Sequence, residues 1–185
     1  MEASRQAVKM DVVFLVWFQA VHLFQFVTVP FYGPETVPAN PKGASTMKIR
    51  LERRYRFSAS HLYRRADWSE EENRRRFGKC ANLPGHGHNY RLYVTVEGSV
   101  DPRTGFVIDL GALDALVGER VLEKLDHQHL NAALPEFAEG AEIPSSENLV
   151  QWIHRHLAGE LPAGAGLVRL RLEEDEDLAA EWSRA

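Results

Sequence analysis

Residues 47–61 read MKIRLERRYRFSASH, and this stretch decides the fold of the chain. Apolar side chains recur at alternate positions, as at Ile49, Tyr55 and Phe57, with charged or polar side chains between them. A period of two is typical of a strand with one buried face. We therefore predict a first strand that ends at His61, whose parity places its side chain on the apolar face.

The rest of the chain shows the same alternation in some stretches and a helical spacing in others. Gly and Pro residues separate these stretches, as they do at turns. The expected elements are a charged loop over 64–76, strands over 86–97, 106–110 and 168–172, and helices over 113–121 and from Ser145 or Ser146 to Leu157. We expect the strand over 106–110 to form an antiparallel hairpin with the strand before it. This order predicts an antiparallel α+β fold.

The first 46 residues differ in composition from the remainder, and we take 47–185 as the domain. Residues 12–34 contain no charged side chain, and residues 33–45 are rich in proline and glycine, which is typical of a linker. An apolar run of this length could span a bilayer, and it could also be a signal peptide. We favour a third interpretation, in which residues 1–46 lie upstream of a true start at Met47 and are not part of the fold.

Composition narrows the class of protein. A chain of 185 residues fits one domain. The 26 acidic residues outnumber the 22 Lys and Arg, and this balance argues against nucleic acid as a partner. Cys80 is the single cysteine, so an intrachain disulfide is excluded. A lone free thiol indicates a reducing compartment, and we expect a cytoplasmic protein without a membrane partner.

Three histidines leave the apolar faces of the first two strands. His86 and His88 are two residues apart, so their side chains project from the same face, and His61 ends the apolar face of the first strand. Burying three imidazoles without partners is costly, whereas three neutral imidazoles suit a zinc ion and leave one coordination position open. The alternative is that the histidines are structural or lie on the surface.

Four other residues could carry chemistry. Cys80 follows Lys79 in a polar loop, where a nearby dication would favour its thiolate, or it is an inert core residue. Asp126 and His127 could form a proton relay or a surface turn. Glu174 shares the parity of the last apolar strand. Its carboxylate would fit a planar guanidine-like group, unless it lies beyond the buried part of the strand.

At these residues the sequence resembles the 6-pyruvoyltetrahydropterin synthase family, which also contains the 6-carboxytetrahydropterin synthases of queuosine biosynthesis. The resemblance covers about residues 47–182. Its motifs, in order, are FSASH (57–61), FGKC (77–80), GHGHNY (85–90), DPRTG (101–105), LDH (125–127), SSEN (145–148) and EE (173–174). The resemblance implies a tunnelling fold, with an antiparallel four-stranded sheet and two helices packed on one face. It also implies trimers or hexamers with sites at subunit interfaces.

The resemblance further implies a role for each candidate. The substrate would be 7,8-dihydroneopterin triphosphate, and a lyase reaction would yield 6-pyruvoyltetrahydropterin with loss of triphosphate. Zinc would be held by His61, His86 and His88. Cys80 would be the general base, with Asp126 and His127 as its relay. Glu174 would hold the pterin, and the substrate-binding residues beside it would be Glu147, Ser145 and Ser146.

Two alternatives to this reaction stay open. Five residues separate Cys80 from His86, as in the pyruvoyl-forming enzymes; the carboxy-forming enzymes usually have three. Ser145, Ser146 and Asp175 stand where threonines are usual in the family. The nearest alternative is a 6-carboxytetrahydropterin synthase, which acts on the same substrate and releases acetaldehyde. An alternative from another class is a non-catalytic module that binds pterin or zinc.

Overall fold

The computed structural model describes residues 47–185, so the predicted leader and linker lie outside the described residues. One sheet organises the domain, with strand order β3-β1-β2-β4-β5. Its strands are β1 (Lys48–His61), β2 (His86–Ser99), β3 (Gln128–His129), β4 (Ala165–Glu173) and β5 (Ala179–Ser183). The long strands β1 and β2 pair antiparallel from Lys48 opposite Ser99 to His61 opposite His86. The paired ends of these two strands therefore carry two of the predicted zinc ligands.

The sheet has five strands, so the prediction of four was wrong. β3 pairs parallel with the end of β1, and β5 pairs antiparallel with β4. Neither edge strand has a long alternating pattern, since β3 has two residues and β5 has five. A period of two cannot be recognised in so short a run.

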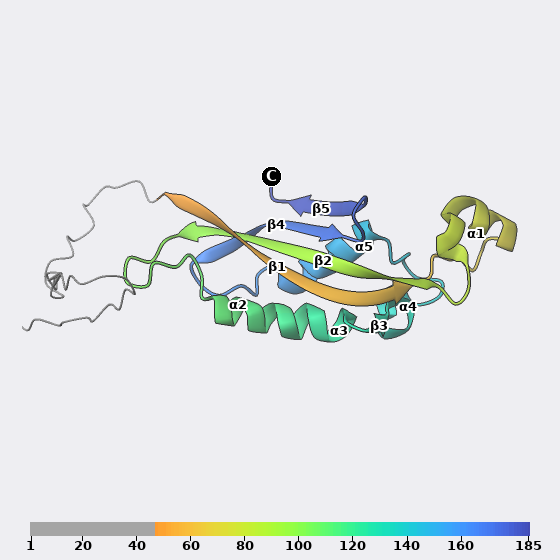
Figure 1. Ribbon diagram of the computed structural model, residues 1–185, viewed down its shortest axis with the longest axis horizontal. Coiled ribbons are helices and arrows are strands. Elements are labelled where there is room, and N and C mark those ends of the chain that lie inside the picture. The colour runs from red at the N-terminus through yellow and green to blue at the C-terminus, as the bar shows by residue number, and fades with distance from the viewer. Residues whose placement is uncertain (1–46) are drawn as a thin grey trace, which may run out of the picture. The chain divides into compact units, whose positions relative to one another are not determined.

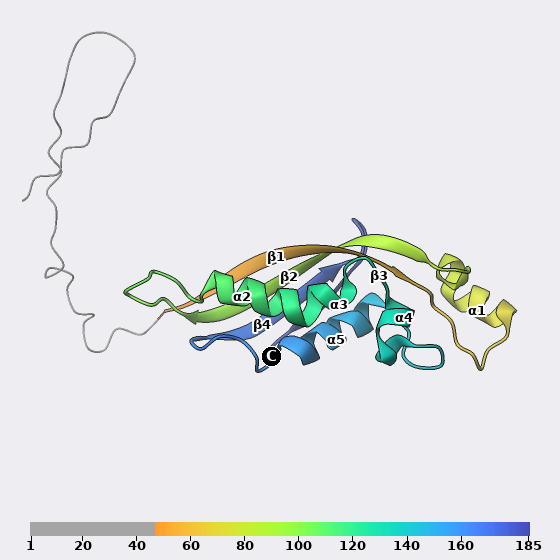
Figure 2. The ribbon, with the colours of Figure 1, turned by 90° about the horizontal axis from the view of Figure 1, so that it is seen from below.

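The helices lie mainly on one face of the sheet. They are α1 (Glu70–Phe77), α2 (Leu110–Val117), α3 (Glu123–Leu125), α4 (Leu130–Ala133) and α5 (Ser146–Leu157). A π-helical turn over Gly118–Leu122 joins α2 to α3, and 3-10 turns cover Gly78–Ala81 and Pro135–Phe137. Figure 2 shows the α2–α3 rod and α5 beneath the sheet. The prediction of two helices on one face is confirmed. Within residues 47–185, no helix combines the length and apolar character needed to cross a bilayer.

We call the sheet side under these helices the covered face, which carries Phe57, His61 and His88. The opposite side, which carries Arg56 and Ser58, is the open face, because no helix of residues 47–185 lies over it in Figures 1 and 2. The core fills the space between the covered face and the helices. Its fully buried side chains include Leu92, Val94, Leu113, Val117, Ile153 and Leu170. Each such side chain contributes about 1.5–3 kcal/mol through burial, so the covered face is the dry side of the sheet.

Residues 106–110 do not form the predicted third strand, and they bend into α2 instead. The physical reason is that β1 and β4 occupy both edges of β2, which leaves no edge for a hairpin partner. Asp109 begins α2, because its side chain accepts a hydrogen bond from the Ala112 amide, 3.1 Å away.

The predicted charged loop over 64–76 contains helix α1, which sequence reasoning missed. The Ser69 side chain caps it by accepting from the Glu72 amide. Acidic residues fill its first turn and basic residues its last, which suits the helix dipole. A polar helix of eight residues shows no apolar stripe, so the periodicity gave no signal.

Candidate metal and acid–base site

Three imidazoles converge at the paired ends of β1 and β2. His61 is fully buried and lies opposite His86 in the sheet register. The two Nε2 atoms are 3.3 Å apart. Two nitrogens bound to one tetrahedral zinc at about 2.0–2.1 Å lie roughly 3.4 Å from each other, so this spacing suits a shared ion. The ring of His88 lies 4.8 Å from that of His86 and 5.0 Å from that of His61, between centroids.

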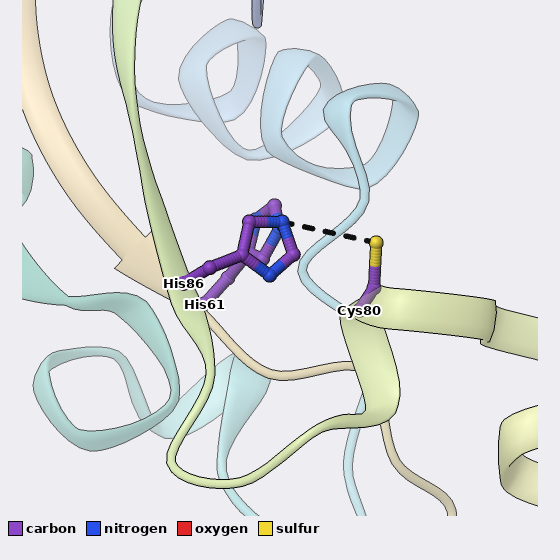
Figure 3. Close-up of side chains that lie close together, drawn as sticks. All are labelled: His61, Cys80 and His86. Atoms are coloured by element: carbon purple, nitrogen blue, oxygen red, sulfur yellow. Dashed lines mark hydrogen bonds between the residues drawn. The ribbon is translucent and has the colours of Figure 1, made fainter.

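The side chains able to ligate an ion form two overlapping groups among the described residues. One contains His61, Cys80 and His86, and the other contains His61, His88 and Glu174. Within each group the ligand atoms all lie within 4.8 Å of one another. The three predicted ligands therefore meet around His61, although His86 and His88 fall into different groups. Figure 3 shows His61 and His86 side by side with Cys80 facing them.

The surroundings of Nε2 of His88 test whether the histidine cluster fits a metal ion. Its Nε2 atom is buried and makes no hydrogen bond with any described residue. Oε1 of Glu174 lies 3.1 Å from that nitrogen, but without hydrogen-bond geometry. A buried polar atom without a partner is costly, and a neutral imidazole nitrogen is a preferred zinc ligand. The donor set therefore fits zinc.

The environment of His61 holds it in the form that binds metals. Its burial, together with the charges of His88 and His86, lowers its pKa to about 3, so the ring is neutral near pH 7. Nδ1 of His61 lies 3.1 Å from the hydroxyl of Tyr90, which is itself buried. This contact turns Nε2 of His61 toward the other histidines. Strand parity is the one sequence signal that could have identified Tyr90, since Tyr90 and His88 lie on the same face of β2.

Cys80 reaches the cluster from the 3-10 turn after α1. Its Sγ atom lies 3.9 Å from Nε2 of His86, the contact drawn in Figure 3. The Cys80 carbonyl accepts a hydrogen bond from the Tyr63 amide at 2.8 Å, which ties the turn to the segment after β1. Burial, and then the negative charge of Glu174, raise the pKa of the Cys80 thiol. These two effects alone favour the thiol, and the thiolate is the form that we expect beside a dication.

Glu174 lies at the cluster and is 5% exposed, just beyond the end of β4. The Ser146 hydroxyl donates a hydrogen bond to Oε2 of Glu174, which leaves Oε1 directed toward His88. Ser145 has a different contact, because its hydroxyl accepts from the Asn148 amide and caps α5. Glu147 follows in the first turn of α5, and its side chain is exposed. The structure thus brings Ser146 and Glu174 together and gives Ser145 a helix-capping contact.

Tyr63 is a second aromatic residue of the site that sequence reasoning missed. Its ring centroid lies 4.5 Å from that of His61. Burial raises the pKa of Tyr63, and the charges of Glu174, Cys80 and Glu147 raise it further. Tyr63 follows the first strand, where the alternation of side chains no longer identifies a face.

Asp126 and His127 lie elsewhere, at the edge of β1. Oδ1 of Asp126 accepts from the Ser58 amide at 2.8 Å and lies 2.9 Å from Nδ1 of His127. The His127 side chain is 80% exposed and borders a hollow that also contains Ser58 and Asn89. Those two side chains point to the open face, because neighbouring strand positions alternate. Within one chain, the structure therefore does not bring the predicted relay to Cys80.

Comparison with known proteins shows the family to which the chain is similar. Residues 50–185 match the 6-pyruvoyl tetrahydropterin synthase family. The chain is 38% identical over 135 residues to a Homo sapiens protein named 6-pyruvoyl tetrahydrobiopterin synthase, covering 73% of this chain and 91% of that protein. It is 30% identical to a Pyrococcus furiosus dihydroneopterin monophosphate aldolase, covering 73% and 97%.

A solved structure extends the likeness to the fold. The Caenorhabditis elegans 6-pyruvoyl tetrahydropterin synthase structure aligns with a TM-score of 0.69 and 31% identity, covering 76% of this chain and 98% of that chain. The family match spans most of the chain, from Arg50 to Ala185. The chain therefore belongs to the 6-pyruvoyl tetrahydropterin synthase family and has its tunnelling fold.

Proposed function

We propose that this protein is a zinc-dependent lyase that converts 7,8-dihydroneopterin triphosphate to 6-pyruvoyltetrahydropterin with loss of triphosphate. The observation that carries the proposal is a thiol beside a buried histidine cluster, with Sγ of Cys80 3.9 Å from Nε2 of His86. The names of the similar human and nematode proteins support the same reaction. The five-residue spacing between Cys80 and His86 also favours the pyruvoyl product.

His61, His86 and His88 would hold the zinc ion. When bound there, zinc supplies a Lewis acid that polarises the oxygens of the substrate side chain and makes the adjacent C–H more acidic. Nε2 of His88 supports this assignment, because it is buried and makes no hydrogen bond, although Oε1 of Glu174 lies 3.1 Å away. Tyr90 orients His61 through its ring nitrogen, as outer partners of metal ligands do.

Cys80 is the proposed general base, because its sulfur faces the cluster and can take a proton from the substrate side chain. Glu174 is proposed to hold the guanidine-like edge of the pterin through two parallel hydrogen bonds. Ser146 fixes its carboxylate, while Glu147 and Ser145 lie on the same turn of α5. The reaction moves electrons within the substrate and needs no external redox cofactor.

Asp126 and His127 are proposed to relay the proton of Cys80 in a second copy of the chain. Their position on the open-face side of the β1 edge supports this arrangement, since a relay on that side cannot serve the thiol of its own chain. The enzyme would then be a homo-oligomer, a trimer or hexamer, with each site at a subunit interface. In a symmetric homo-oligomer the same interface repeats, so each copy of the site would be completed in the same way.

Product analysis of the full-length protein tests the proposal. The zinc-loaded protein is incubated with 7,8-dihydroneopterin triphosphate, and the products are identified by mass spectrometry. We expect a tetrahydropterin with an intact three-carbon pyruvoyl side chain, together with free triphosphate. A 6-carboxy product with acetaldehyde, or an aldol cleavage like that named for the Pyrococcus relative, would contradict the proposed reaction. Zinc binding without turnover would favour a non-catalytic module.

A further inference from the structure

The open face of the sheet carries an uneven distribution of charge. Toward the start of β1, Arg50 and the neighbouring Arg169 of β4 are paired with carboxylates, whereas Arg54 forms no ion pair with any residue of 47–185. The ion pairs there join Arg50 to Glu97 at 3.0 Å, and Arg169 to Glu52 at 3.0 Å and to Glu181 at 2.8 Å. These exposed pairs offset much of the positive charge on that half of the face and contribute little to stability individually. The half of the face nearer the predicted relay has a different balance of charge.

Near the relay, arginines outnumber carboxylates. Arg56 on β1 lies directly opposite Arg91 on β2 in the sheet register. Like charges at directly opposed positions destabilise a sheet. Glu173 lies 3.5 Å from Arg91, but it also lies 3.2 Å from Arg171, so one carboxylate serves two cations. Within residues 47–185, Arg56 forms no ion pair.

A hollow of about 470 Å³ lies beside this arginine pair. The residues around it are Arg56, Phe57, Ser58, Asn89, Tyr90, Arg91, Asp126 and His127. Asp126 is the one carboxylate among them, and it already accepts from the Ser58 amide and contacts His127. Two guanidinium groups and several polar donors therefore surround a space with little opposing negative charge. Such a donor set fits an anion with several oxygens.

We propose that this hollow binds the oligophosphate group of the substrate, with Arg56 and Arg91 as its main contacts. The proposal rests on the proposed function, in which triphosphate leaves the same three-carbon side chain that loses a proton. His127 borders the hollow, so a subunit that offers its relay to the Cys80 of another chain also offers the two arginines. When the C–O bond to triphosphate breaks, the bonding electrons leave with the phosphate oxygen. The guanidinium groups stabilise that growing negative charge.

Binding of inorganic triphosphate to the full-length protein tests this site without turnover. Isothermal titration calorimetry is run on the unaltered protein, on the double variant Arg56→Gln/Arg91→Gln, and on Arg50→Gln. Arg50 is a matched control, because it lies on the same strand and face and loses the same charge. We expect the double variant to bind triphosphate about 10–100-fold more weakly, the effect of losing charged hydrogen bonds. Arg50→Gln should change the affinity for triphosphate less than about threefold, because salt screens the effect of a charge that lies away from the bound ligand.

Three outcomes would overturn the inference: no binding by the unaltered protein, no change in the double variant, or an equal loss in Arg50→Gln. An equal loss in Arg50→Gln would mean that the affinity for triphosphate depends on the total positive charge of the open face and not on the two arginines. Product analysis separates this inference from the proposed function. Turnover with unchanged triphosphate affinity in the double variant would refute the arginine site alone. Triphosphate binding that depends on the arginines, without any lyase product, would refute the reaction alone.

Discussion

The covered and open faces of one strand pair differ in almost every physical property. On the covered face, His61 and Glu174 are buried, and the pKa of His61 falls to about 3. On the open face, Arg56 and His127 are exposed to solvent and remain available for charged partners. His61 and Arg56 both lie on β1, close to each other in the sequence. Alternation along a strand is enough to separate them.

From this comparison we infer that the two faces of the sheet have different roles in the proposed reaction. The proposed zinc-assisted proton removal is favoured on the dry side, where electrostatic interactions are stronger. Recognition of a highly charged group suits the wet side, where arginines keep their solvation until a ligand arrives. A single chain cannot combine the two sides in one site, since the sheet lies between them. Two copies of the chain can, and the predictions below test this arrangement.

The largest expected effect comes from the covered face, in the variant Cys80→Ala. Removing the base should lower turnover by about 10²–10⁴-fold, the usual contribution of a general base. The zinc content should stay unchanged, because three histidines remain. Both are measured on the same preparation, by product formation and by elemental analysis. Turnover that survives the substitution would show that Cys80 is not the base, and loss of zinc would make it a ligand.

The variant His127→Ala tests the open-face side in the same way. We expect turnover to fall by about 10²-fold while zinc stays bound, since this residue lies away from the cluster. Unfolding and refolding this variant together with Cys80→Ala, in equal amounts, should restore activity. About one quarter of the sites would then combine an intact thiol from one chain with an intact relay from another. No recovery in mixed oligomers would place the relay and the thiol in the same chain.

The sequence predicted which side chains lie on the covered face, but it could not predict where Asp126 and His127 lie relative to Cys80. Parity alone placed His61, His86 and His88 on one face, because a long strand fixes the direction of every side chain. Glu174 followed from the same rule. The position of Asp126 depends on a turn that pairs with the edge of β1, and no periodicity specifies such a contact. The short edge strands and the polar helix α1 escaped prediction because neither contains a full period of apolar residues.

A smaller effect is expected from Tyr90→Phe, which removes one hydroxyl from the covered face. The hydroxyl contacts Nδ1 of His61, and loss of such an outer partner lowers metal affinity by about 10–100-fold. Competition with a chelator measures the affinity, and long-range ¹H–¹⁵N spectra report the tautomer of His61. Phe57→Leu is the control, since it alters the ring stacked on Tyr90 but keeps the hydroxyl. Equal zinc affinity in Tyr90→Phe and the unaltered protein would rule out a positioning role.

The smallest effects separate two neighbouring serines at the start of α5. Ser145 caps the helix, so Ser145→Ala should lower the free energy of unfolding by about 1 kcal/mol and leave KM unchanged. Ser146 donates to Glu174, so Ser146→Ala should raise KM, because the proposed pterin-binding carboxylate loses its fixed orientation. Denaturant unfolding and steady-state kinetics on both variants provide the comparison. If Ser145→Ala raised KM and Ser146→Ala did not, substrate recognition would depend on the helix end, and the contact between Ser146 and Glu174 would be structural.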